Sequence, residues 1–260
     1  MFLVTNKLMG GLGNYLFQIS SSYAYSIKHN NKFICDISDT ISPHNSYQFY
    51  IKNILRKIKF LKLEQNYKVY HEPSFNYVEI PDFKSDIKLV GYFQSEKYFT
   101  EYREEILELF SIDDESQKII TEKYSDILKL DNCSLHVRRG DFVNLQNYHT
   151  LQTIDYYKKS VEIIGENKYY LIFSDDIKWC EENLSFIKNK IFISGNYDYI
   201  DLYLMSLCKN NIIANSTFSW WGAWLNRNNN KKVIIPTKWF GVNNTHLNTI
   251  DLYCDKWIKV

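Results

Sequence analysis

The sequence predicts an α/β protein made of two Rossmann-like domains that face each other across a cleft. In the second half of the chain, short runs rich in Ile, Val, Phe and Tyr alternate with helix-like segments, which is typical of βαβ units and a parallel sheet. The first half opens with a strand, a glycine-rich turn and a helix. The chain has 260 residues, which is enough for two domains, and we expect these to cover residues 1–130 and 131–260.

The amino-terminal domain is expected to start with a strand at residues 2–5. A turn at residues 10–13 follows, and apolar residues at helical spacing, such as Leu16 and Ile19, predict a helix over residues 14–29. The other elements expected here are strands at residues 32–35 and 88–93 and a mixed, partly helical stretch at residues 44–70.

The carboxy-terminal domain is expected to hold five parallel strands connected by helices. Ligands of open α/β sheets bind beyond the carboxyl ends of the strands, so we expect the functional site there. The strands are expected at residues 134–137, 169–173, 190–194, 211–215 and 232–236, and the helices at residues 153–165, 176–184, 198–209 and 219–226.

The composition argues against several classes of protein. Lys and Arg number 31 and Asp and Glu number 30, and the resulting net charge of +1 does not suit a general binder of nucleic acid or anionic membranes. The apolar run at the start is too short for a signal peptide, and no window approaches the ~18 apolar residues of a transmembrane helix. Five cysteines without C-x-x-C spacing indicate free thiols in a reducing compartment. We therefore expect a cytoplasmic protein with a local anion site.

No pattern typical of a metal site occurs in the sequence. The histidines are scattered, and neither H-E-x-x-H, an EF-hand loop nor a strict Asp-x-Asp triplet is present. We expect no metal and no cofactor, so that an anionic leaving group would be stabilised by arginine and a helix N-terminus.

The first candidate motif is His136-Val-Arg-Arg-Gly-Asp141, at the carboxyl end of the first strand of the second domain. Strand alternation would place His136 and Arg138 on one face and Arg139 on the other. The planar fork of arginine suits bidentate phosphate binding, and a strand end is a costly place for two charges. The alternative is that both arginines form structural ion pairs and that Asp141 caps the next turn. We favour binding for Arg138 and a structural role for Arg139.

The second motif, Asn215-Ser-Thr-Phe-Ser-Trp-Trp-Gly-Ala-Trp224, runs from a strand into a helix. Free N–H groups at a helix start form an anion site, and the hydroxyls of Ser216 and Thr217 would supplement Arg138. The alternative is ordinary N-capping by these residues or by Ser219. Three tryptophans at helical spacing are expected in the core rather than on a sugar platform: Trp220, Trp221 and Trp224.

The third motif, Phe173-Ser-Asp-Asp176, also lies just past a predicted strand. Acidic residues at this position often accept hydrogen bonds from a ribose or a base. Asp175 or Asp176 would equally serve as a helix N-cap. The two interpretations are compatible, and we give them equal weight.

The fourth motif, Met9-Gly-Gly-Leu-Gly-Asn14-Tyr-Leu-Phe-Gln18, together with Asp36, approaches a dinucleotide-binding fingerprint. Leu16 stands where the third glycine of that fingerprint would be, so the match is partial. One alternative is a plain tight turn. The other is a turn in which Gly11 and Gly13 let the backbone approach a ligand while Asn14 offers its amide.

Together, these motifs resemble those of the α-1,2-fucosyltransferases, the inverting family that transfers L-fucose from GDP-fucose to the 2-hydroxyl of galactose. Residues 10–18 are similar to the family's N-terminal signature, residues 136–141 to its donor-binding motif and residues 215–224 to its third block. Residues 173–176 fall between them in the expected order, and residues 88–99 are similar to another family segment. The resemblance spans roughly residues 8 to 240.

The resemblance implies a GT-B-like fold, no metal requirement, and GDP-β-L-fucose bound mainly by residues 131–260, with residues 1–130 on the acceptor side. Arg138 would hold the β-phosphate and stabilise the departing GDP, and Asn14 would reach the fucose. The remaining residues implied in donor binding are Gly11, Gly13, His136, Arg139, Asp175, Asp176, Ser216, Thr217 and Phe218, with the two aspartates near guanosine.

Inversion by a single displacement calls for a general base on the face opposite GDP. Asp141 is the best candidate because it lies in the motif, although it would equally orient Arg138. The sequence departs from the family pattern at Tyr15, where glutamine is usual, and at Phe142, where tyrosine is common. The change at Tyr15 bears either on the acceptor pocket or on packing.

The implied acceptor is a galactose-terminated oligosaccharide or polysaccharide precursor, with peripheral membrane association if that acceptor is lipid-linked. No nucleic-acid partner is expected. The alternatives are a GDP-sugar transferase of α-1,3 or α-1,6 linkage, a nicotinamide-dependent oxidoreductase that uses the glycine turn and Asp36, and a non-catalytic sugar-binding module that uses the tryptophans.

Overall fold

The computed structural model describes residues 1–41, 47–64 and 66–260 and divides into two compact units. The first comprises Met1–Asp113 with Asn248–Cys254, and the second Asp114–Leu247 with Asp255–Val260. This division differs from a single boundary at residue 130, because helix α4 (Asp114–Lys129) packs against α7 (Asp198–Leu207) and β7 (Asn132–Val137) of the second unit. The short return of residues 248–254 to the first unit was not expected from the sequence.

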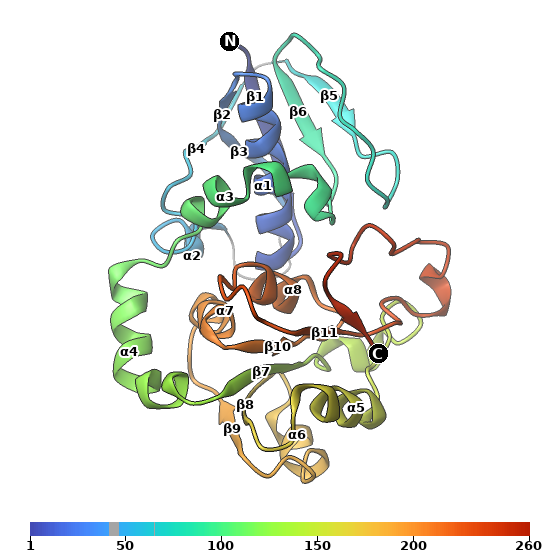
Figure 1. Ribbon diagram of the computed structural model, residues 1–260. Helices are drawn as coiled ribbons and strands as arrows, with labels where there is room; N and C mark the ends of the chain where they lie inside the picture. The colour runs from blue at the N-terminus through green and yellow to red at the C-terminus, as the bar shows by residue number, and fades with distance from the viewer. Residues whose placement is uncertain (42–46, 65) are drawn as a thin grey trace. The chain divides into compact units, whose positions relative to one another are not determined.

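The first unit is built on a sheet whose described strands are all parallel, in the order β4-β3-β1-β6-β5 with β2 paired to β1 (Figure 1). Helix α1 (Leu12–Lys28) follows β1 and packs against it, and side chains such as Val4, Leu8 and Leu16 are fully buried there. The strands are β1 (Leu3–Met9), β2 (Lys32–Phe33), β3 (Cys35–Ile41), β4 (Phe60–Leu61), β5 (Lys68–His71) and β6 (Ile87–Val90).

The predicted mixed stretch at residues 44–70 contains one short helix, turns and two short strands in its described part. Helix α2 spans Tyr47–Tyr50, while residues 42–46 and 65 lie outside the described residues. After β6 come two 3-10 helices, η1 (Glu96–Tyr98) and η2 (Thr100–Tyr102), and then helix α3 (Arg103–Leu109).

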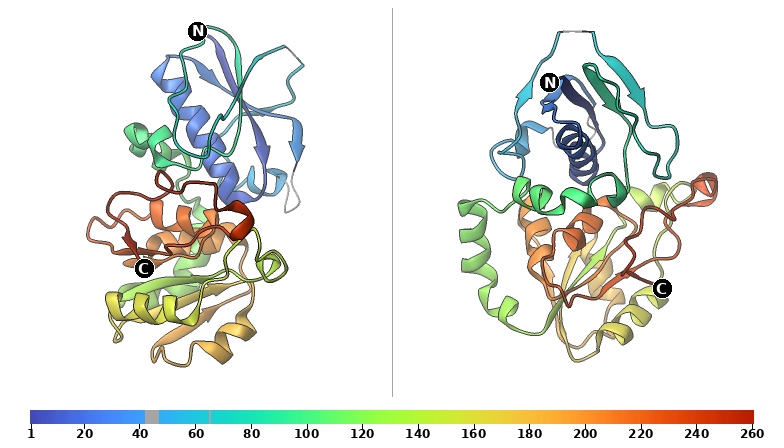
Figure 2. Two further views of the ribbon diagram at one scale, coloured as in Figure 1. Left: turned by 90° about the vertical axis from the view of Figure 1, so that its right-hand side faces the viewer. Right: turned by 45° about the horizontal axis from the view of Figure 1, so that its top comes forward.

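The second unit is a parallel sheet in the order β12-β11-β10-β7-β8-β9, with helices on both of its faces (Figures 1 and 2). The five predicted strands are confirmed, but the sheet has a sixth, β12 (Ile258–Lys259), which pairs with β11. Two exposed residues do not form an apolar run, so this strand left no signal in the sequence. The other elements are β7, β8 (Tyr169–Ser174), β9 (Lys190–Ile193), β10 (Asn210–Ile212), β11 (Val233–Ile235), α5 (Ile154–Ile164), α6 (Ile177–Asn183), α7, α8 (Thr217–Trp224), η3 (Asp141–Asn144) and η4 (Val242–Asn244).

The central strand β7 is buried along its whole length, and its alternation decides which side chains meet which helices. Cys133, Leu135 and Val137 join one hydrophobic cluster with residues of α5 and α6. Ser134 lies on the opposite face, where its hydroxyl accepts a hydrogen bond from Asn211 Nδ2, which also donates to the carbonyl of Met205 in α7. His136 shares that face by the same alternation.

The three tryptophans of α8 are core residues, as predicted. Trp220 and Trp221 are fully buried and Trp224 nearly so, and Trp220 also contacts Trp257. Close packing of α8 against α7 requires Gly222, because a Cβ there would lie 2.8 Å from Cβ of Met205. A role for these tryptophans as an exposed sugar platform is therefore excluded.

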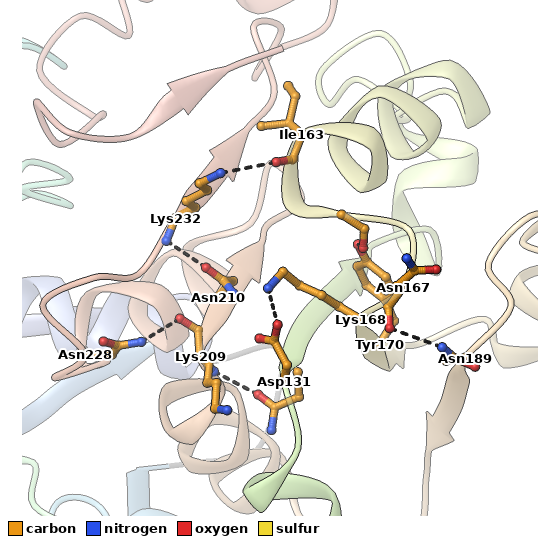
Figure 3. A network of polar contacts seen from close by, with 12 residues as sticks. Asp131, Ile163, Asn167, Lys168, Tyr170, Asn189, Lys209, Asn210, Asn228 and Lys232 are labelled. Carbon is orange, nitrogen blue, oxygen red and sulfur yellow. Dashed lines mark hydrogen bonds and ion pairs between the residues drawn. The ribbon is translucent and has the colours of Figure 1, made fainter.

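The amino ends of the strands in the second unit are joined by a network of polar contacts (Figure 3). Lys168, before β8, forms an ion pair of 2.5 Å with Asp131, before β7. The backbone N–H of Lys232, before β11, donates to Asn210 Oδ1 of β10 at 2.9 Å. Parallel strands bring their amino ends to one edge of the sheet and their carboxyl ends to the other. The network therefore lies at the edge opposite to the one where the sequence motifs are found.

Candidate active site

Three of the four predicted motifs meet at the carboxyl edge of the second sheet. Residues 138–141 follow β7, Asp175 and Asp176 follow β8, and Ser216 follows β10. Because β10, β7 and β8 are adjacent and parallel, these segments lie side by side. The sequence interpretation that placed the ligand site at this edge rests on the same geometry.

Arg138 is held between two carboxylates. Its Nη2 lies 2.5 Å from Asp141 Oδ1 and its Nη1 lies 2.8 Å from Asp175 Oδ2. Its guanidinium carbon also lies 5.2 Å from the ring centroid of Phe142. About a quarter of the side chain is exposed, so Arg138 is oriented by its neighbours while part of it faces solvent.

Arg139 has a different set of partners. Its Nε lies 3.0 Å from Asp176 Oδ2, and its guanidinium lies 4.4 Å from the ring of Trp179. The prediction that strand alternation separates the two arginines is wrong, because β7 ends at Val137. The two side chains instead point to different partners, because Arg138 pairs with Asp175 and Arg139 pairs with Asp176.

Asp175 and Asp176 both serve this local framework. Asp176 caps α6, its Oδ1 accepting from the backbone N–H of Trp179 at 3.1 Å. Asp175 Oδ1 accepts from the backbone N–H of Arg139 at 2.8 Å, while its other oxygen faces Arg138. The capping role expected for one of the two is confirmed for Asp176.

Gly140 is required by the position of Asp175. A Cβ at Gly140 would lie 2.5 Å from Asp175 Oδ2 and 3.0 Å from its carboxyl carbon. Any larger residue would push this carboxylate away from Arg138. The glycine of the motif therefore preserves the orientation of the arginine.

His136 is a buried, neutral side chain beside this cluster. It is 6 % exposed, its Nδ1 has no hydrogen-bond partner among the described residues, and its ring lies 5.8 Å from that of Phe218. Burial, and secondarily the charge of Arg138, lowers the pKa of His136 to about 3. The imidazole therefore remains uncharged at neutral pH, with its Nδ1 buried and unpaired among the described residues.

Among the described residues, no side chain caps the start of α8, so the capping alternative is wrong for this helix. Ser216 is the N-cap residue but makes no capping hydrogen bond, and the hydroxyl of Ser219 bonds back to carbonyls of Ala214 and Ser216. Ser216, Thr217 and Phe218 are half-buried. Such an uncapped helix start presents N–H groups and the positive end of the helix dipole to its surroundings.

Asn215 anchors the turn that precedes α8. Its Nδ2 donates to the carbonyls of Thr150 and Trp239, both at 2.8 Å, and its Oδ1 accepts from Gln152 Nε2 at 3.0 Å. These three bonds account for the asparagine of the motif by structure alone.

In the first unit, the glycine motif positions Asn14 at the start of α1. Gly10 has φ +83°, and a Cβ there would lie 2.2 Å from Asn14 Nδ2, so both conformation and space require glycine. Asn14 Oδ1 accepts from Gln94 Nε2 at 3.0 Å. Gly11 is the N-cap of α1, whereas Gly13 lies inside the helix and not in the turn where it was expected.

Two further residues of the first unit support this arrangement, and neither was predicted from the sequence. Gln18 is almost fully buried and bonds both the N–H and the carbonyl of Met9, at 3.0 and 3.2 Å. Glu72 accepts from the N–H groups of Tyr92 and Phe93 and so holds the turn before Gln94; burial raises the pKa of Glu72. Gln18 belonged to a quoted motif, but nothing local marked Glu72.

Comparison with known proteins identifies the family. The family model described as "Glycosyl transferase family 11" matches residues 1–260. The chain belongs to glycosyl transferase family 11. It is 33 % identical to an alpha-1,2-colitosyltransferase of Escherichia coli over 100 % of this chain and 99 % of that protein. It is 30 % identical to the O-antigen biosynthesis glycosyltransferase WbnK of Escherichia coli over 97 % of this chain and 99 % of that protein.

Solved structures share the fold of this family 11 chain. The fucosyltransferase NodZ from Bradyrhizobium matches with a TM-score of 0.58 at 13 % identity, over 85 % of this chain and 92 % of NodZ. A structure of the same protein soaked with GDP-fucose gives a TM-score of 0.57 at 13 % identity, over 86 % of this chain and 92 % of that one. The predicted GT-B-like α/β fold is thus confirmed.

Membership of family 11 argues against the dinucleotide-binding alternative, and the contacts of Asp36 in the structure show why the fingerprint does not apply. Asp36 is 2 % exposed and does not reach a ligand: its carboxylate accepts from Lys88 Nζ at 2.9 Å and from the N–H of Ser38. Tyr15, one of the two departures from the family pattern, is fully buried and packs edge-on against Tyr50. Its effect in this family 11 chain is therefore on core packing.

The described residues carry neither a cluster of metal-ligating side chains nor a membrane-spanning helix. Within residues 1–41, 47–64 and 66–260, no group of three or more His, Cys, Asp or Glu gathers in a way that would hold a metal ion. In the same part of the chain, no helix is long and apolar enough to cross a membrane. All five cysteines are buried free thiols.

Proposed function

We propose that this family 11 glycosyltransferase transfers L-fucose from GDP-β-L-fucose to the 2-hydroxyl of a terminal galactose, with inversion and without a metal ion. The observation that carries the proposal is the arrangement at the carboxyl edge of the second sheet. A partly exposed arginine, a neutral histidine whose Nδ1 is unpaired among the described residues and an uncapped helix start converge there. Each of these groups suits a nucleoside diphosphate.

In the proposed reaction, Arg138 binds the diphosphate and stabilises the charge that develops on departing GDP. His136 and Phe218 contact the nucleotide, and Asp175 orients Arg138. The N–H group of Thr217 and the hydroxyls of Ser216 and Thr217 bind phosphate oxygens, while the N–H group of Ser216 already donates to the carbonyl of Ala214. Asn14 contacts the sugar from the first unit. Arg139, paired with Asp176, acts structurally.

Asp141 is the candidate general base for the acceptor hydroxyl. Its ion pair with Arg138 equally suits a residue that orients the arginine, and the carboxylate is about half exposed. To act as a base, the carboxylate of Asp141 must lose its ion pair with Arg138 when the donor binds. The diphosphate oxygens would compete for the same guanidinium and so release this carboxylate.

The 33 % identity to a colitosyltransferase favours a second candidate donor, GDP-L-colitose. Colitose is L-fucose without its 3-hydroxyl, so the two donors place the same diphosphate in the same site. A site that evolved for fucose should hydrogen-bond the 3-hydroxyl, so it should discriminate strongly against colitose, which would leave that hydrogen-bonding group of the protein unpaired. A site that evolved for colitose has no such group, so binding of colitose leaves none unpaired.

The acceptor that we propose is a galactose-terminated oligosaccharide or polysaccharide precursor. A relative that acts in O-antigen biosynthesis supports a surface glycan, and peripheral association with the membrane follows if that glycan is lipid-linked. Buried free thiols are compatible with a reducing cytoplasmic location.

Titration calorimetry combined with product analysis tests the donor and the linkage. GDP and GDP-fucose should bind and NADH should not, chelation of metal ions with EDTA should leave transfer unchanged, and linkage analysis should find the 2-position of galactose substituted. Arg138→Ala should lower kcat/KM on the order of 10²–10³-fold, whereas the matched Arg139→Ala should act mainly on stability. Near wild-type transfer by Arg138→Ala would refute the diphosphate role, and faster transfer from GDP-colitose would replace the donor.

A further inference from the structure

A hollow in the first unit has the chemistry of a sugar-binding subsite. It is a small, partly enclosed hollow that opens to solvent. Its lining includes three buried residues of α1, here called its floor: Ser21, Ala24 and Tyr25. It also includes three tyrosines from the segments before and after β6, here called its aromatic sides: Tyr77, Tyr98 and Tyr102.

The floor of the hollow carries an unsatisfied polar group. The hydroxyl of Ser21, a residue only 1 % exposed, has no hydrogen-bond partner among the described residues. Leaving a buried hydroxyl unpaired costs free energy. Ser21 lines the hollow, but its hydroxyl oxygen is itself buried. A ligand hydroxyl would therefore supply the missing partner only if the side chains around Ser21 shifted to admit it.

The aromatic sides are held rigidly. The rings of Tyr77 and Tyr98 lie 4.8 Å apart, edge to face, and Tyr98 packs in the same way against Phe93 at 5.2 Å. The hydroxyl of Tyr98 accepts from the N–H of Val78 at 3.2 Å. Rings fixed in this way offer a preformed surface to the C–H face of a pyranose, at low cost in conformational entropy.

The rim is charged but balanced. Lys28 pairs with Glu79 at 2.8 Å, and Lys97 pairs with Asp251 at 2.5 Å. Glu101 also lines the hollow, whereas Asp251 does not, so the charged side chains of the lining are two lysines and two glutamates. They offer donors and acceptors to hydroxyl groups. A neutral sugar therefore fits this rim better than an anionic ligand does.

The hollow lies along α1 from Asn14. Ser21 follows Asn14 by seven residues, which is about two helical turns and ~10 Å along the axis, on the same face of the helix. An oligosaccharide with its terminal unit near Asn14 spans this distance with its next units. The hollow is thus placed for an inner residue of the acceptor glycan.

We propose that this hollow binds an internal pyranose of the acceptor, inward from the galactose that receives fucose. The proposal rests on the proposed function, because it takes the acceptor to be an oligosaccharide whose end lies near Asn14. It adds a specificity site: the enzyme selects longer, neutral galactose-terminated glycans over simple galactosides.

Steady-state kinetics with two acceptors of different length test the subsite. With GDP-fucose as donor, kcat/KM of the wild type should be at least tenfold higher for lacto-N-tetraose than for methyl β-galactoside. Tyr77→Ala should raise KM for lacto-N-tetraose about tenfold and leave KM for methyl β-galactoside and for GDP-fucose unchanged. Tyr23→Ala is the matched control, since Tyr23 is a half-buried tyrosine of α1 outside the hollow and packs on Phe33.

Ser21→Ala provides a readout that does not depend on removal of a large side chain. The variant removes an unpaired buried hydroxyl, so its thermal stability should equal or exceed that of the wild type, while KM for lacto-N-tetraose should rise several-fold. Equal effects of Tyr77→Ala on both acceptors, or wild-type KM values in both variants, would overturn the subsite. Absence of transfer to either acceptor by the wild type, with GDP-fucose bound, would instead count against the proposed acceptor class.

Discussion

Gly140→Ala perturbs the donor site through a single methyl group. The new Cβ would lie 2.5 Å from Asp175 Oδ2, so this oxygen must retreat by about 0.9 Å to reach the 3.4 Å of ordinary contact. Asp175 holds Arg138 Nη1 and the N–H of Arg139, both at 2.8 Å. A retreat of this size stretches the contact between Asp175 Oδ2 and Arg138 Nη1 beyond hydrogen-bond range, whereas the N–H of Arg139 binds the other oxygen, Oδ1.

The magnitude follows from the bond between Asp175 and Arg138. Hydrogen bonds to charged groups contribute about 1.5–3 kcal/mol each, and partial exposure of Arg138 and Asp175 favours the lower end. If the misaligned arginine costs about 2 kcal/mol of binding free energy in the donor complex, GDP affinity falls on the order of 10–30-fold. Misplacement of the guanidinium by about 1 Å should lower kcat by up to ~10²-fold.

Titration calorimetry with GDP and initial rates with the sugar donor measure these losses. Gly195→Ala is the control: Gly195 has φ +74° and nothing within 4 Å of an added Cβ, so its cost is confined to backbone strain. That variant should lose about 1–2 kcal/mol of stability and keep its GDP affinity.

A double-mutant cycle decides whether Asp175 transmits the effect. On an Asp175→Ala background, Gly140→Ala should reduce GDP affinity by less than twofold further, because the displaced carboxylate is already gone. Wild-type GDP affinity in the single Gly140→Ala variant, or fully additive losses in the double variant, would refute this account.

Three other predictions address stability, pH and catalysis. Gln18→Ala should lower the free energy of unfolding in urea by about 2–4 kcal/mol, because Met9 loses both its partners; the exposed control Gln48→Ala should lose under ~0.5 kcal/mol, and equal losses would contradict the prediction. The folded pKa of about 3 at His136 lies below the unfolded 6.5, so acidification protonates the unfolded state first and stability falls as pH drops from 6.5 toward 3. From pH 7 to pH 5 this loss is about 2 kcal/mol, and His136→Asn should remove it; an unchanged pH slope would rule this origin out. If Asp141 is the base, Asp141→Asn lowers kcat on the order of 10²–10⁴-fold with GDP affinity nearly constant, whereas a matching drop in GDP affinity assigns it to orienting Arg138.

Local patterns in the sequence were sufficient for the second sheet. Strands β8 and β11 are apolar runs because helices cover both faces of the sheet, and such runs are visible without the structure. The buried strands β7 and β10 also carry Asn, Ser or His. The exception is β12, whose two exposed residues rely on pairing with β11. Helix α4 was also missed, since only Ser116, Ile120 and Ile127 of its residues are buried and the rest reads as polar chain.

The candidate site was predictable in its residue types but not in its pairings. The arginines and aspartates of the motifs were recognised because charges at the ends of buried strands are costly. Which aspartate directs which arginine depends on contacts between segments 36 and 37 residues apart. Strand alternation also predicted different roles for Arg138 and Arg139, but the structure does not support that reason, because the strand ends before both residues.

By itself, the sequence determined the fold class, the edge of the sheet where the site forms and the residues that carry the proposed chemistry. All three follow from local periodicity and from the energetic cost of placing charge beside buried strands. Only the tertiary structure decided that Asp175 and Gly140 together orient Arg138 and that Gln94 contacts Asn14, a residue 80 positions away. It also revealed the tyrosine-lined hollow along α1. These features arise from packing between distant segments, and such packing leaves no periodic trace along the chain.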